Sequence, residues 1–333
     1  MVMFEGFANV WTPVTLASRL GKTPLAVELA GEKLVFFRGR DGKVGALVDR
    51  CPHRGVRLSL GGVAPSGCLT CPFHGWEFDV DGNARFVPLN PDAKLDRLSA
   101  TALPARELGG LLWVYTAPKS TPAEPIVPAT LTDPKLARTY LEEEWNAHWT
   151  RAMENMLVSP HVPFVHRNTI GRFVRPRLQP NSRMDVEWED TDFGGRTFAI
   201  IDNDRSIDPG RLEFYRPNIM VLHIPMPKQT FRMHAICVPV AAQKVRMIVV
   251  GARSFAKLSL LNPLFNYSNK RIVAEDRAVV ESSDPPVVPP AAQEVSVRSD
   301  RATLAFRKYY FQSLHTSSVS VKRGLPVVTD SPV

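Results

Sequence analysis

Short apolar runs separated by glycine-containing turns dominate the first third of the chain. Five such runs lie at residues 33–37, 44–48, 76–80, 84–87 and 111–115. Asp41-Gly42 separates the first two runs, and Asp81-Gly82 separates the next two. An Asp-Gly pair between apolar runs is a strong signal for a β-hairpin. We therefore expect the N-terminal part of the chain to be an all-β domain.

The composition changes abruptly at residues 118–134. This segment is rich in Thr, Ala and Pro, with prolines at positions 118, 122, 125, 128 and 134. Such a composition favours an extended connection over helices or strands. We predict that it is a linker between an N-terminal domain at 1–117 and a C-terminal domain at 135–333.

The C-terminal part mixes helical and strand-like patterns. Helical periodicity is expected through Trp145–Leu157 and again from about Pro263 to Glu281, where the proline falls in the first turn. Between them lie strand-like runs at 183–188, 196–201, 219–223, 231–238 and 245–250. The whole chain is thus predicted to be α+β: a β-domain followed by a helix-grip-like antiparallel sheet wrapped around a long C-terminal helix.

Composition and charge narrow the class of protein. The chain has 333 residues, 44% of them hydrophobic and 22% charged, as in ordinary globular proteins. The net charge is +8, and the basic residues are spread along the chain without any run of five. This spread disfavours nucleic acid as a partner. The positive charge is then explained either by a solvated surface or by a surface that attracts an acidic electron-donor protein. No stretch resembles a signal peptide or a membrane span. A cytoplasmic protein with no membrane contact is expected.

Two short segments each combine one cysteine with one histidine. Cys51 precedes His53 by two residues, and Cys71 precedes His74 by three. Thiolate and imidazole ligands suit zinc, iron and iron–sulfur centres. Such a ligand set is compatible with a structural zinc site or with a two-iron cluster. The pairing of one Cys with one His in each segment favours the cluster, in which two Cys hold one iron and two His hold the other. Cys68, three residues before Cys71, is more simply a small buried residue.

The residues around these ligands support the cluster. The segments CPHRGV at 51–56 and CPFHGW at 71–76 closely resemble the cluster-binding loops of Rieske proteins. This resemblance implies that Cys51, His53, Cys71 and His74 bind a Rieske [2Fe–2S] cluster.

A second pair of histidines, His161 and His166, follows the first predicted helix of the C-terminal part, with Pro163 between them. Two such histidines converge on a metal only if the chain bends, so alone they are weak evidence. The segment 154–166, ENMLVSPHVPFVH, resembles the mononuclear iron motif of Rieske non-haem iron oxygenase α subunits, and the resemblance extends over nearly the whole chain. The layout is most similar to the single-chain monooxygenases and demethylases.

In that family two His and one carboxylate from a C-terminal helix bind Fe(II) and leave one face of the ion open. Asp276 best matches the carboxylate position, with Glu275, Glu281 and Asp284 as alternatives. The resemblance thus implies that His161, His166 and Asp276 bind mononuclear Fe(II).

One position departs from the family pattern. The family usually has an Asp three residues before the first iron His. That Asp bridges an iron His of its own subunit to a Rieske His of a neighbouring subunit. This chain has Val158 at the position. Glu154, one helical turn earlier, is expected to supply a carboxylate within reach of His161 or of the neighbouring subunit's His74. Asn155 and water are further candidates, and an ion pair between Glu154 and Arg151 is the structural alternative.

The resemblance also implies an activity. A separate NAD(P)H-dependent reductase, with or without a ferredoxin, would supply electrons to a homotrimer that uses O2 to hydroxylate or oxidatively demethylate a small aromatic or polycyclic substrate. No G-x-G-x-x-G nucleotide motif is present in the chain. We expect the substrate to lie near Ile219–His223, Phe231–His234 and Asn168. The rival function is a Rieske electron carrier whose second domain only docks partners.

Overall fold

The structure is a computed structural model that describes residues 3–204 and 211–314. These residues form two compact units, which divide between Ala123 and Glu124. The division falls inside the segment predicted to be a linker. The predicted domain end at residue 333 lies outside the described residues.

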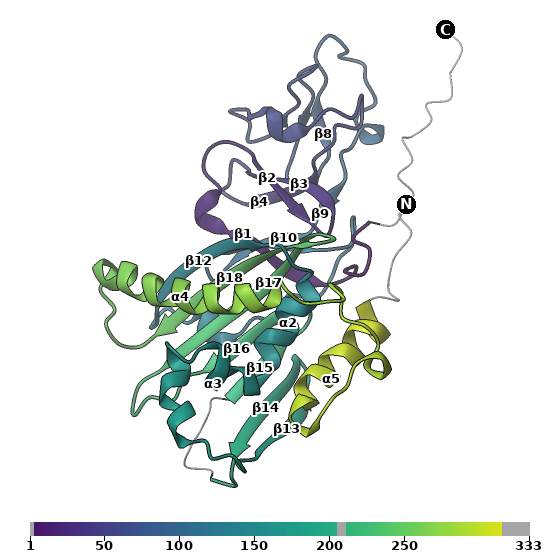
Figure 1. The fold of residues 1–333 in the computed structure, drawn as a ribbon. Coiled ribbons are helices and arrows are strands. Elements are labelled where there is room, and N and C mark those ends of the chain that lie inside the picture. The colour runs from purple at the N-terminus through teal and green to yellow at the C-terminus, as the bar shows by residue number, and fades with distance from the viewer. Residues whose placement is uncertain (1–2, 205–210, 315–333) are drawn as a thin grey trace. The chain divides into compact units, whose positions relative to one another are not determined.

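The first unit contains three small antiparallel sheets (Figure 1). One has the order β1-β11-β10, with bounds Trp11–Leu16, Leu111–Tyr115 and Ala105–Leu108. The second has the order β2-β3-β4-β9, with bounds Leu25–Leu29, Glu32–Arg38, Val44–Val48 and Ala102–Leu103. The third has the order β5-β6-β7-β8, with bounds Gly62–Val63, Leu69–Thr70, Glu77–Phe78 and Ala84–Phe86.

Both predicted hairpins of this unit are confirmed. Strands β3 and β4 pair across the turn at Asp41-Gly42, and β7 and β8 pair across Asp81-Gly82. Gly42 and Gly82 both have a φ of +82°, a conformation that glycine adopts without strain. The hairpins bring two loops to the same small core, which contains Val35, Phe37, Leu47, Leu58 and Phe78.

The second unit is built on one seven-stranded antiparallel sheet of order β12-β18-β17-β16-β15-β14-β13. The strand bounds, in chain order, are Ala137–Trp145, Met184–Thr191, Gly194–Ile201, Arg211–Tyr215, Ile219–His223, Phe231–Ala241 and Lys244–Arg253. The helices are α1 to α5, at Ala129–Thr132, Trp149–Leu157, Val162–Val165, Asn262–Val280 and Arg301–Tyr309. The helix α4 runs across the sheet and contacts β12, while α2 contacts β16 to β18 (Figure 1). The predicted α+β fold is confirmed.

The start of the helix predicted at Trp145 is wrong. Trp145 ends strand β12, where it pairs with Val245 of β18. The helix α2 begins four residues later, because the Nδ1 atom of His148 accepts a hydrogen bond from the backbone N–H of Thr150 and caps the helix. Periodicity alone did not separate a strand end from a helix start that follows within four residues.

The described part of the chain contains no helix that is both long and apolar enough to span a bilayer. The long helix α4 buries Asn269, Val273, Asp276 and Val280. This spacing of three to four residues places the four side chains along one helix face. The helix therefore presents Asp276 to the interior of the unit.

Candidate functional site

The two Cys-His loops of the first unit have the same backbone geometry. In each loop the cysteine N–H donates to the carbonyl five residues ahead, Cys51 to Val56 and Cys71 to Trp76, over 2.8 Å. In each, the glycine four residues ahead donates back to the cysteine carbonyl, and these glycines have φ values of +73° and +70°. A side chain at either glycine would strain the turn. The structure therefore presents two equivalent half-sites.

The four predicted ligands separate into a thiol pair and an imidazole pair. Cys51 and Cys71 are each 2% exposed, and their side chains lie within hydrogen-bonding range of each other. The Nδ1 atoms of His53 and His74 face each other at 3.2 Å, nearer the surface. A Rieske cluster needs this sorting, with two sulfurs on one iron and two nitrogens on the other. The residues present fit the cluster.

The local electrostatics also fit a bound metal centre. Burial, reinforced by the neighbouring Cys71, raises the pKa of Cys51 to about 11. Burial and the nearby Arg54 and His74 lower the pKa of His53. Iron ligation requires thiolate and neutral imidazole, and a metal ion reverses the penalty on paired thiolates. Trp76 stacks on His53 with a ring separation of 4.6 Å and fixes its orientation.

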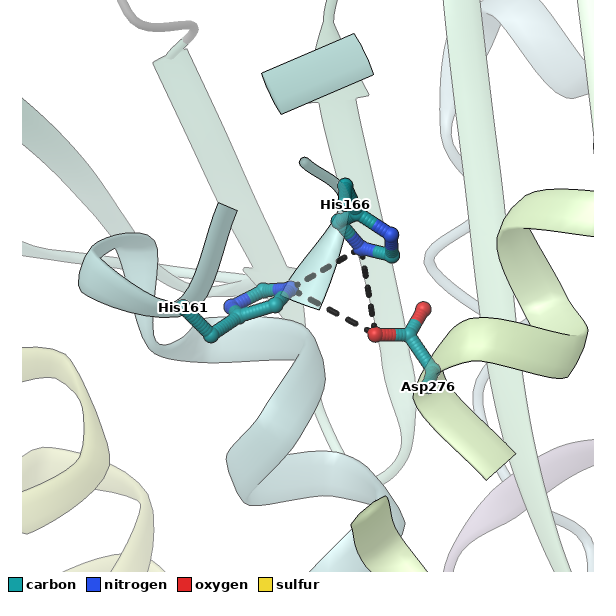
Figure 2. A group of neighbouring side chains, drawn as sticks. All are labelled: His161, His166 and Asp276. Atoms are coloured by element: carbon teal, nitrogen blue, oxygen red, sulfur yellow. Dashed lines mark hydrogen bonds and ion pairs between the residues drawn. The ribbon is translucent and has the colours of Figure 1, made fainter. Parts of the chain in front are cut away.

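The second candidate centre brings together residues far apart in the sequence. His161 ends the short 3-10 helix η4 (Ser159–His161), His166 follows α3, and Asp276 lies on α4. Figure 2 shows the two imidazoles and the carboxylate converging on one point. The Nε2 atoms of the histidines are 3.2 Å apart, and Asp276 Oδ1 lies 3.5 Å from that of His161 and 3.1 Å from that of His166.

Among the described residues, this is the one group of three or more potential ligands whose donor atoms all lie within 4.8 Å of one another. Two imidazoles and one carboxylate are the donor set of non-haem Fe(II) centres. Asp276 completes this group, and Asp284 is not part of it. Glu275 directs its carboxylate at His166 Nδ1 instead, and Glu281 bonds to Arg277.

Each of these three side chains also makes a hydrogen bond to a residue outside the triad. The Nδ1 atom of His161 bonds to the backbone carbonyl of Val158, and Nδ1 of His166 lies 2.9 Å from Glu275 Oε2. Asn155 donates from Nδ2 to Asp276 Oδ1 over 2.9 Å. Such contacts leave both Nε2 atoms free for a metal and fix the ring orientations.

Burial and the neighbouring carboxylates oppose each other at both histidines, and the net pKa shifts differ in direction. Burial lowers the pKa of His161, although the Asp276 carboxylate partly opposes this. Burial alone would also lower the pKa of His166, but Asp276 and Glu275 outweigh it and raise that pKa. A metal cation would replace the proton that the carboxylates attract to His166.

The carboxylate of Glu154 pairs with two arginines. Its Oε2 accepts from Arg151 at 3.0 Å and its Oε1 accepts from Arg307 at 2.5 Å. No hydrogen bond joins Glu154 to His161 among the described residues. The arginines hold the Glu154 carboxylate, and Nδ1 of His161 bonds to the carbonyl of Val158 instead. The ion pair with Arg151 was the alternative considered. A contact with the neighbouring subunit's His74 stays a prediction.

A cavity of about 670 Å³ opens beside the triad. His161, His166 and Asp276 form part of its wall, and most of the remainder is apolar. Of the residues expected around it, the wall includes Asn168, Met220, Leu222, Phe231 and Met233. His234 is not part of the lining: it is fully buried and bonds to Thr130 and to the carbonyl of Val250.

Three polar residues near the triad were not assigned their roles from the sequence. Glu275 was considered only as a ligand, yet it partners His166, and Thr169 donates to the same Glu275 oxygen over 2.6 Å. Asn269 is 6% exposed and lines the cavity. It lies seven residues before Asp276, two helical turns on the same face, so the spacing could have indicated it.

Comparisons with known proteins agree with both candidate centres. A Rieske [2Fe-2S] domain matches residues 10–100, and a vanillate O-demethylase oxygenase C-terminal domain matches residues 145–315, just over half of the chain. Methylxanthine N1-demethylase NdmA of Pseudomonas putida is 29% identical over 325 residues, 92% of this chain and 88% of that protein. The structure of NdmA from strain CBB5 with caffeine superposes with a TM-score of 0.78 at 26% identity, covering 91% of this chain and 90% of that one.

Other relatives share only part of their length. Phthalate 4,5-dioxygenase oxygenase subunit of Pseudomonas putida is 32% identical over 207 residues, which are 57% of this chain and 46% of that protein. The chain thus spans about half the length of the first curated relatives that it matches. Dicamba monooxygenase bound to dicamba shares the fold, with a TM-score of 0.75 at 20% identity over 93% of this chain and 97% of that one.

The two matched domains are those that carry a Rieske [2Fe–2S] cluster and a mononuclear iron. They occur here in the expected order, on the fold of a solved demethylase. The chain belongs to the Rieske non-haem iron oxygenases, as an α subunit with a catalytic domain of the vanillate O-demethylase type.

Proposed function

We propose that the chain is the terminal oxygenase component of a multi-protein system. Cys51, His53, Cys71 and His74 would hold the cluster, and His161, His166 and Asp276 would hold the mononuclear iron. When bound, the cluster relays single electrons and the iron activates O2. The observation that carries this proposal is that the His161–His166–Asp276 triad forms part of the wall of the apolar cavity.

The side chains have separable tasks in this proposal. The carbonyl of Val158 and the carboxylate of Glu275 accept the Nδ1 protons of His161 and His166, so that both Nε2 atoms face the metal position. Asn155 holds Asp276. The cavity wall supplies apolar contacts for the substrate and excludes bulk water beside it.

The reaction proposed is hydroxylation or oxidative demethylation of a small organic molecule. One oxygen atom of O2 enters a C–H bond, and the other leaves as water. A separate reductase supplies the electrons, with or without a ferredoxin, and solvent supplies the protons. Monooxygenation is favoured over dioxygenation because NdmA, which is similar over 92% of this chain, is by name a demethylase.

Assembly and cellular setting follow as parts of the same proposal. A homotrimer would bring the cluster of one subunit to the iron of the next, with Asn155, Glu154 or water near the gap that Val158 leaves. All four cysteines are buried and free of disulfides, which suits a reducing compartment such as the cytoplasm.

Oxygen uptake tests this function. Reduced protein, loaded with iron and supplied with a surrogate reductase, is expected to consume O2 faster when a substrate from an aromatic and polycyclic panel is present, and to yield a product carrying label from ¹⁸O2. The Asp276→Ala variant should lose both effects. A wild-type protein that holds cluster iron alone would instead be an electron carrier.

A further inference from the structure

The cavity beside the triad is large and mainly apolar. Its volume of about 670 Å³ lies in the range of pockets for drug-sized ligands. The sheet contributes Leu212, Met220, Leu222, Met233 and Ala235 to the wall, and α4 contributes Leu264, Phe265, Ile272 and Val273. A molecule with an extended apolar body, such as several fused rings, would fill more of this wall than a single ring.

Two cationic side chains interrupt the apolar wall. Arg172, on the 3-10 helix η5 (Ile170–Phe173), and Arg271, on α4, both line the cavity and are exposed. The guanidinium of Arg172 lies 4.6 Å from the ring centroid of Phe173. Neither arginine has an ion pair with a described residue. By contrast, Arg277 on the same helix pairs with Glu281 at 2.8 Å.

The charge of the wall is therefore unbalanced. Among the described residues that line the cavity, Asp276 is the one acidic residue, and it belongs to the metal triad. A bound metal cation would neutralise it and leave the charges of Arg172 and Arg271 uncompensated. Charges of one sign beside a low-dielectric wall concentrate the opposite charge. Arg271 precedes Asp276 by five residues, about 7.5 Å along the helix axis, so an anion held there need not contact the metal position.

We propose that the cavity binds an organic anion: a largely apolar body whose carboxylate, sulfonate or phosphate lies against Arg172 and Arg271. The inference rests on the proposed function for the identity of the cavity as the substrate site. The two arginines would then select charged substrates over neutral molecules of the same shape, and would orient the apolar body toward the triad.

A matched pair of fluorescent probes tests the proposal on the intact protein. Anilinonaphthalene sulfonate and N-phenyl-1-naphthylamine share one ring system, and only the first carries an anion. Both become fluorescent in apolar sites, so titration gives a Kd for each. The Ala235→Trp variant, or Leu222→Trp if the first does not fold, fills the cavity and identifies the fluorescence that arises there.

The Arg172→Gln/Arg271→Gln double variant is expected to weaken binding of the sulfonate probe about tenfold, as for a lost charge-assisted contact, and to change binding of the neutral probe by less than twofold. Arg175→Gln, at an exposed position outside the lining, is the matched control and should change neither. Raising the salt concentration should weaken binding of the sulfonate probe and leave binding of the neutral probe unchanged.

The proposal would be overturned if the double variant lost affinity equally for both probes, or if it lost no affinity for the sulfonate probe. Sulfonate binding that survives Ala235→Trp but falls in the double variant would place the anion on the outer surface, as for an acidic protein partner, and would also overturn it. Measuring the iron content of the double variant distinguishes a failure of this proposal from a failure of the proposed function. If the triad retains iron while the probes do not discriminate, the anion proposal fails and the oxygenase proposal stands.

Discussion

Nδ1 of His166 lies 2.9 Å from Oε2 of Glu275, the residue that precedes the candidate ligand Asp276. His161, in contrast, bonds to a backbone carbonyl. The helix α4 thus supplies the carboxylate of Asp276 for the metal position, and the preceding residue, Glu275, supplies a carboxylate for the imidazole of His166. Thr169 anchors Glu275 through its hydroxyl. The same helix therefore fixes both the candidate metal ligand, Asp276, and Glu275, the residue that positions His166.

We predict that Glu275→Ala lowers the affinity for Fe(II) about 10- to 100-fold, because His166 loses the group that fixes its ring and tautomer. Glu275→Gln keeps an acceptor and should lose less. Competition with a chromophoric chelator measures the affinity, and the cluster absorption should stay unchanged. Glu281→Gln, at the residue that caps the C-terminus of α4, is the control. An unchanged affinity in Glu275→Ala would show that the contact does not support the metal.

A buried ion pair joins α2 to α5. Glu154 is 8% exposed, and Arg307, which is 5% exposed, lies 153 residues away in sequence. Arg307→Ala removes one of the two arginine partners of the buried Glu154 and leaves Arg151, so it should lower the free energy of unfolding by about 2 kcal/mol. Denaturant titration measures this. If Glu154 also contacts His74 of the neighbouring subunit, Glu154→Gln should slow cluster-to-iron electron transfer in single-turnover experiments. An unchanged transfer rate would leave Glu154 with the structural role alone.

Glu294 should make stability depend on pH. The Arg151 guanidinium, together with that of Arg307, holds the pKa of Glu294 at about 2, below the ordinary value of 4.5. A depressed carboxyl pKa stabilises the fold above the unfolded-state pKa, and that contribution fades as pH falls from about 4.5 toward 2. Glu294→Gln should therefore be less stable than wild type at pH 7, with the difference shrinking near pH 3. A constant difference at both pH values would contradict this.

The assignment of the cluster ligands predicts a contrast between neighbouring cysteines. Cys71→Ser should bleach the visible absorption of the purified protein, because the buried thiol pair loses one member. Cys68→Ser, three residues away and also buried, should retain the spectrum. The reverse result would reassign the ligand.

Local motifs could be predicted from the sequence, whereas long-range partners could not. Cys51, Cys71, His161 and His166 lie in short segments whose spacing carries the chemistry. Strand β12 was missed, because its partner β18 lies about a hundred residues later and residues 118–145 carry no strand signal strong enough to show it. The pairing of Glu154 with Arg307 depends on how α5 packs, which no local pattern encodes.

Iron analysis combined with EPR spectroscopy tests the central claim most directly, with wild type and Asp276→Ala compared side by side. We predict that wild type contains mononuclear iron in addition to the cluster iron. Asp276→Ala should lose the mononuclear iron while the reduced protein keeps the full Rieske signal. An Asp276→Ala protein with undiminished iron, or a wild type with cluster iron alone, would contradict the account.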